Sequence, residues 1–168
     1  MTINTLPIIT EKTKAILTVN DTYYRSIILE GGEETYYKQK PEKLIDHSCI
    51  INGASLDGRR KFIKMIFNIK HKIPIPVDPQ QGVFLFPTCS TKKEECTWIS
   101  YFHMREYKQM GTKTYITFHD DTGILVNNSI NSIEMQDMRT SKIVARMSRN
   151  LYPGFSPFPK IRLDKDPK

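Results

Sequence analysis

Short hydrophobic runs separated by turn-forming residues are the feature of this sequence that most constrains its fold. In the first third of the chain three such runs follow one another: 14–19, 22–30 and 33–39. Asn20-Asp21 and Gly31-Gly32 separate them, and these residue types tolerate the positive φ angles of tight hairpin turns. The pattern therefore predicts an antiparallel meander at the start of the chain.

Similar runs continue through the middle of the chain. We expect further strands at 44–51, 82–88, 96–104, 114–119 and 123–126. Asp120-Asp121-Thr122 separates the last two and is another hairpin signal. Residues 72–82 contain three prolines, which lack amide donors, so this segment is predicted to be an extended edge or a loop.

Two segments carry helical signals instead. Ser55 can cap a short helix over 56–67, although Gly58 disfavours it by up to about 1 kcal/mol relative to Ala, and a strand from Phe62 is the alternative. Asn131 can cap a longer helix, with Glu134 returning a bond to the cap. We expect that helix to continue to about Asn150, because no Pro or Gly interrupts it.

The predicted fold class is α+β: a mostly antiparallel sheet with a short central helix and a longer amphipathic C-terminal helix. An apolar content of 39% suits one core. Residues 1–150 are therefore expected to form a single domain, and the proline-rich residues 151–168 an irregular tail.

The basic charge is unevenly distributed. The chain carries a net charge of +7, yet residues 1–54 have six Lys and Arg against seven acidic residues, a net charge of −1. The remaining residues therefore carry +8. A segregated positive field attracts a polyanion, so nucleic acid is a candidate partner.

The first candidate site is a basic stripe on the late helix. Four cations fall within an arc of about 80°, spread over roughly 15 Å, which suits contact with successive phosphates. These are Arg139, Lys142, Arg146 and Arg149. The opposite face holds Ile133, Thr140, Val144, Met147 and Leu151. The alternative interpretation is the solvated outer face of an amphipathic helix.

The second candidate site surrounds the short helix. It consists of Arg59, Arg60, Lys61 and Lys64, with Lys70 and Lys72 just beyond. A glycine before paired basic residues lets backbone approach a phosphate closely. The alternative is a basic turn whose long side chains lie over the core.

Other chemistry has weaker support. Phe84 and Phe86 alternate along a strand and could stack bases in a single-stranded DNA or RNA module, but burial in the core is favoured. A thiol site at His47 and Cys49, or zinc held by the three cysteines with His47 or His103, lacks the usual spacing. We expect a non-enzyme with no cofactor and no metal.

Several short blocks resemble the competence transcription factor family, ComK, of Gram-positive bacteria. They are D-x-S-C at 46–49 with a glycine soon after, G-R at 58–59, V-D-P at 77–79, F-L-F-P-T at 84–88 and C-x-W-I-S at 96–100. The resemblance extends from about Asp46 to Lys108 and continues more weakly through the late helix. Several blocks recur in order, which makes it specific.

The resemblance implies a function. Members of this family activate DNA-uptake genes, bind AT-rich boxes of promoter DNA largely through the minor groove, and assemble as dimers that pair into tetramers. It also implies contact with RNA polymerase and with an adaptor that delivers the protein to a Clp-type protease. The proline-rich tail departs from the charged terminal helix of the family and predicts a shortened C-terminus, which puts tail-dependent activation and degradation in doubt.

We expect a cytoplasmic location, with nucleoid association on DNA. No apolar run approaches the roughly 18 to 20 residues that span a bilayer, and the first residues lack a secretion signal.

Overall fold

The computed structural model describes residues 5–90 and 95–148 of the chain. The α+β class is confirmed. The strands are β1 (Thr13–Thr18), β2 (Ser26–Glu30), β3 (Glu33–Tyr37), β4 (Ile75–Asp78), β5 (Val83–Pro87), β6 (Thr97–Ser100), β7 (Met104–Met110), β8 (Lys113–Phe118) and β9 (Gly123–Val126). The helices are α1 (Pro41–Ile51), α2 (Leu56–Phe67) and α3 (Ile130–Met147), with short 3-10 turns at Pro79–Gln81 and Tyr101–His103.

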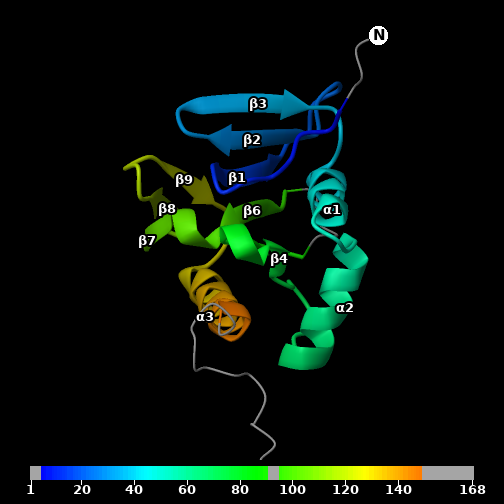
Figure 1. Ribbon diagram of the computed structural model, residues 1–168. Coiled ribbons are helices and arrows are strands. Elements are labelled where there is room, and N and C mark those ends of the chain that lie inside the picture. The colour runs from blue at the N-terminus through cyan, green and yellow to red at the C-terminus, as the bar shows by residue number, and fades with distance from the viewer. Residues whose placement is uncertain (1–4, 91–94, 149–168) are drawn as a thin grey trace, which may run out of the picture.

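The strands form two antiparallel sheets. The larger has the order β3-β2-β1-β6-β5-β4 and the smaller β7-β8-β9. Figure 1 shows α1 and α2 along one side of the molecule, the smaller sheet on the opposite side, and α3 at the end away from β3. The predicted meander (β1 to β3), the edge strand β4 and the hairpin β8–β9 are confirmed.

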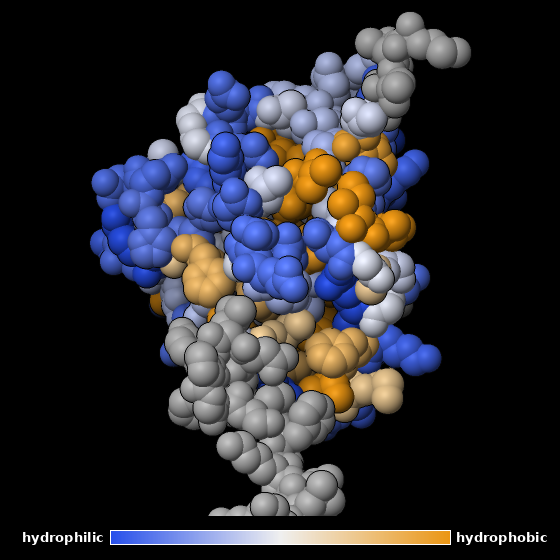
Figure 2. Space-filling model, in the orientation of Figure 1, coloured by the Kyte–Doolittle hydropathy of each residue, from blue (hydrophilic) through white to orange (hydrophobic). Residues whose placement is uncertain are grey.

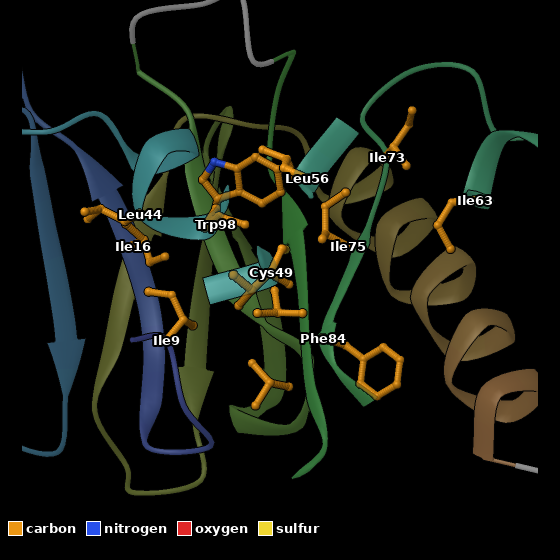
Figure 3. Close-up of a cluster of buried hydrophobic side chains, with 14 of the residues drawn as sticks. Ile9, Ile16, Leu44, Cys49, Leu56, Ile63, Ile73, Ile75, Phe84 and Trp98 are labelled. Carbon is orange, nitrogen blue, oxygen red and sulfur yellow. The ribbon is translucent and has the colours of Figure 1, made fainter. Parts of the chain in front are cut away.

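The central strands of the larger sheet are buried on both faces, whereas its edge strand β3 is mostly exposed. Because successive side chains of a strand point to opposite faces, Ile16 joins one cluster and its neighbour Ala15 the other. The Ile16 cluster includes residues from α1, α2 and α3 (Figure 3). The Ala15 cluster includes Ile116 and Phe118 of the smaller sheet. The central strand β1 is therefore apolar at consecutive positions.

The predicted strand at 44–51 is wrong: these residues form most of α1. Pro41 occupies the first turn, where its missing amide costs no hydrogen bond. The buried positions are spaced by one, three and four residues: Pro41, Leu44, Ile45, Ser48 and Cys49. This spacing forms a helical face, and so short an apolar run does not separate helix from strand by itself.

Further differences from expectation concern the end of one strand, one additional strand and the start of α3. The predicted strand at 96–104 ends at Ser100, and after a 3-10 turn the chain enters β7 in the other sheet. β7 was not predicted, because its sequence, MREYKQM, is polar and mostly exposed. Helix α3 is capped by Ser129, whose hydroxyl accepts from the Ser132 amide at 3.3 Å, so the predicted Asn131 cap is wrong.

A buried lysine connects the two sheets. The ammonium of Lys14, on β1, donates to the Asp120 carboxylate and to the Thr122 hydroxyl, each at 2.8 Å, in the turn between β8 and β9. These bonds hold the pKa of Asp120 well below its ordinary value, with the Lys14 bond the largest cause. Within the described residues, no helix has the length and apolar character needed to cross a membrane.

Candidate nucleic-acid interface

Helix α3 presents part of the predicted basic stripe. Its buried positions are Ile133, Gln136, Thr140 and Ile143. The Lys142 and Arg146 side chains are exposed, one turn apart, about 6 Å along the helix axis. Arg149 and Leu151 lie outside the described residues.

Arg139 belongs to the same stripe but is half-buried. Its guanidinium donates to the carbonyl of His71 at 3.3 Å and to the side-chain oxygen of Gln136 at 3.4 Å. Gln136 and Ile143 are buried although they lie outside the predicted apolar face. The buried face of α3 is therefore closer to Arg139 around the helix than expected. Arg139 is therefore partly engaged in attaching α3 to the rest of the protein.

The segment 68–73 attaches α3 to the end of α2. The side-chain amide of Gln136 donates to the carbonyl of Lys72 at 2.8 Å and to that of Pro87 at 2.7 Å. The Lys72 ammonium donates to the Ser132 hydroxyl at 3.1 Å. These bonds hold the segment along α3, and the exposed Lys70 belongs to the same segment.

A cation–aromatic contact links the basic stripe of α3 to the C-terminal end of α2. The Arg146 guanidinium lies 5.8 Å from the centre of the Phe67 ring, at the last residue of α2. Arg146 of α3, more than 70 residues from α2 in sequence, thus lies at the C-terminal end of α2.

The basic residues of α2 divide into two kinds. Arg60 is half-buried and lies 3.6 Å from the Asp57 carboxylate, while Lys61 and Lys64 are exposed. The predicted N-cap is confirmed, since the Ser55 hydroxyl accepts from the Gly58 amide at 3.0 Å. Arg60, Lys61 and Lys64 therefore project from a helix whose first turn is capped.

Arg59 instead bonds inside the protein. Its guanidinium donates to the carbonyls of Pro76 at 2.8 Å, Asn52 at 3.1 Å, Cys49 at 3.2 Å and Ala54 at 3.4 Å. These bonds connect the end of α1, the start of α2 and strand β4. With most of its donors satisfied by backbone, Arg59 is geometrically a brace rather than a group that is free to meet a ligand.

The alternative sites do not assemble. Phe84 and Phe86 are 2% and 0% exposed, so their predicted burial in the core is confirmed and they do not form the alternative stacking platform. Cys49 lies on the buried face of α1. Burial raises the pKa of its thiol to about 11, which disfavours the reactive thiolate. Among the described residues, no group of three or more His, Cys, Asp or Glu side chains could hold a metal ion.

Two exposed methionines were missed by the sequence interpretation. Met135 and Met138 of α3 are exposed, and on a helical wheel Met135 falls between Lys142 and Arg146. The basic stripe thus includes an apolar side chain. The missed signal was the spacing of Met135 to Lys142, seven residues, which returns to the same helix face.

The sequence matches the family described as ComK protein over residues 4–151. The chain belongs to this family. The chain is also 38% identical over 117 residues to the competence transcription factor of Bacillus subtilis (strain 168). That alignment covers 69% of this chain and 61% of the relative, so the chain spans less than two thirds of the relative's length. No solved structure matches the chain.

Two of the blocks that resemble the ComK family, D-x-S-C at 46–49 and G-R at 58–59, meet at the junction between α1 and α2. The Asp46 carboxylate accepts from the Leu56 amide at 2.9 Å, and the Ser48 hydroxyl accepts from the Ile9 amide at 2.8 Å. Arg59 reaches the Cys49 carbonyl of the same block. These family residues therefore fix the position of α2, while the exposed cations of α2 lie on its outer side.

Proposed function

We propose that this chain is a sequence-preferring DNA-binding transcriptional activator of competence (DNA-uptake) genes. Membership of the ComK family and the name of the Bacillus subtilis relative support the proposal. The observation that carries it is the contact of Arg146 with Phe67, which brings the basic stripe of α3 to the C-terminal end of α2 and supports one shared surface.

The proposed DNA surface contains the accessible cations of the two helices and of the segment between them. It consists of the exposed Lys61, Lys64, Lys70, Lys142 and Arg146, with the half-buried Arg60 and Arg139 at its edges. Arg149 is included from the sequence pattern. Such side chains contact phosphates, position the protein on the duplex and make its affinity depend on salt.

We propose that the surface reads AT-rich boxes largely through the minor groove. A·T tracts have a narrow, strongly negative minor groove that favours inserted Arg and Lys, and shape is read there more than individual bases. The exposed Met135 and Met138 add support, because minor-groove proteins use apolar side chains as wedges between base steps.

The remaining partners follow from the family. We propose that the chain associates with itself as a dimer or tetramer, so that paired surfaces contact boxes about one helical turn apart. RNA polymerase, a protease adaptor and a cytoplasmic, nucleoid-associated location belong to the same proposal. It contains no catalytic role and no cofactor.

The test is a binding titration on matched AT-rich and GC-rich duplexes and on the corresponding single strands, at several salt concentrations. The proposal predicts tighter binding to the AT-rich duplex than to either competitor. Equal affinity for both duplexes would contradict the sequence preference. Tighter binding to single strands would favour a single-strand-binding module instead.

A further inference from the structure

Apolar side chains are exposed on the outer side of α2 and at the end of α1. The exposed fractions run from 41% at Phe62 and Ile66 to 74% at Met65, and both Ile50 and Ile51 of α1 are more than half exposed. Figure 2 shows hydrophobic residues at the surface on the side where α1 and α2 lie. Nothing in the core or in the proposed DNA surface uses these five residues.

Helix α2 has three distinct faces. Leu56, Ile63 and Phe67 contribute to the core. At 100° per residue, the cations Arg60, Lys61 and Lys64 centre about 85° from that face, and Phe62, Met65 and Ile66 centre about 130° from it on the other side. The centres of the basic and apolar flanks are therefore separated by roughly 145° around one helix. Lys61 and Met65 adjoin where the flanks meet, whereas Arg60 and Lys64 stay free when the apolar flank is covered.

We propose that the apolar flank of α2 is the surface through which two copies of this chain pair. The two α2 helices lie antiparallel about a two-fold axis near Phe62, with Ile50 and Ile51 at the margin. The proposal names the surface for the self-association included in the proposed function, although pairing itself requires no DNA.

The size of the flank suits a second copy. The exposed fractions of the five residues correspond to roughly 500 Å² of surface, at the upper end of what a typical monomer leaves exposed as one patch. With a polar margin, this approaches the ~800 Å² that each partner contributes to a standard interface.

The flank is also complementary to itself. An antiparallel pair centred on Phe62 brings Ile66 of one helix opposite Gly58 of the other, since both lie four residues from the axis. A Cβ at Gly58 would meet only the Ser55 hydroxyl, so the helix surface there is open and lets the partner helix approach. A two-fold axis repeats this contact, as an isologous interface requires.

Pairing in this way leaves both basic flanks available to one duplex. The braces that fix α2 against α1, from Arg59 to the Cys49 and Asn52 carbonyls, also keep Ile50 and Ile51 beside the helix. The paired surface and the DNA surface are then separate sides of one rigid element.

The first test is the mass of the full chain in solution without DNA, measured by sedimentation equilibrium. The wild type is expected to be a dimer, and Met65→Glu to raise the dimer Kd at least tenfold, because a charge would be buried at the interface centre. Met110→Glu, at a residue 55% exposed on β7, is the matched control and should keep the wild-type mass. A monomeric wild type, or an unchanged mass for Met65→Glu, would overturn the proposal.

The second test is cross-linking. Phe62→Cys places a thiol beside the axis, and the three native cysteines are buried. Mild oxidation with diamide, which takes up two electrons and two protons from two thiols, should yield a disulfide-linked dimer of Phe62→Cys but not of Met110→Cys. If the chain's own C-terminal residues covered the flank instead, Phe62→Cys would stay uncross-linked, and the pairing would be refuted. Neither test contains DNA, so their failure leaves the duplex titration free to decide DNA binding.

Discussion

Helices α2 and α3 both carry clusters of basic residues, but the first arginine of α2 and the last described arginine of α3 have different roles. Arg59, in the first turn of α2, donates to four backbone carbonyls around the α1–α2 junction. Arg146, in the last turn of α3, is exposed, and its guanidinium lies beside the ring of Phe67. The two arginines are alike in the sequence and opposite in role.

The difference shows that the number of basic residues in a helix does not indicate how many of them can contact a ligand. A guanidinium whose donors are satisfied by carbonyls fixes the backbone, because removing it takes a charged hydrogen-bond donor from each of those carbonyls. A guanidinium that is exposed beside other cations is free to meet phosphates. Burial and hydrogen-bond partners separate the two roles, and variants can test each.

The largest stability effect is expected at the brace. Arg59→Ala should lower the free energy of unfolding by about 2–3 kcal/mol, since several charge-assisted bonds to backbone are removed at once. Arg146→Ala, its matched control, should stay within about 0.5 kcal/mol of the wild type. Urea denaturation measures both, and equal losses for the two variants would break the comparison.

A smaller effect is expected at the cap that starts α3. Ser129→Ala should cost about 1 kcal/mol, because the Ser132 amide loses its side-chain acceptor. Asn131→Ala, inside the first turn, should change stability by only a few tenths of a kcal/mol. If Asn131→Ala lowered the free energy of unfolding more than Ser129→Ala in urea or thermal denaturation, Asn131 would be the cap instead.

The last effect is expected in the pH dependence of stability and concerns Lys14, another cation used internally. Its bond to Asp120 lowers the pKa of that carboxyl, so the pair contributes stability above the ordinary Asp pKa of about 4. This contribution is lost as the pH falls toward the lower pKa of the folded state. Lys14→Met keeps the packing and should flatten the decline of unfolding free energy below about pH 4. An unchanged acid profile would show that the ion pair does not set it.

Local signals in the sequence predicted much of the fold. The turns at Gly31-Gly32 and Asp120-Asp121-Thr122 and the cap at Ser55 were recognisable because each depends on the residue types at a few adjacent positions. Helix α1 was missed because its apolar run is too short to show a period. Strand β7 was missed because exposure lets its residues be polar.

The candidate site was less accessible from sequence. The cations of α2 and α3 were identified by their helical spacing, but their proximity depends on Gln136 and Phe67, whose partners are distant along the chain. The role of Arg59 was hidden because its acceptors are backbone carbonyls, which every residue has. Tertiary contacts of this kind leave no local pattern.

The central claim is that the accessible cations of α2 and α3 form one DNA surface, and the salt dependence of duplex binding tests it most directly. The double variant Lys142→Ala/Arg146→Ala should reduce the slope of log affinity against log salt by about two units, one for each phosphate-binding side chain that is removed. Lys40→Ala, at an exposed lysine before α1, is the control and should leave the slope unchanged. A double variant that keeps the wild-type slope would contradict the account.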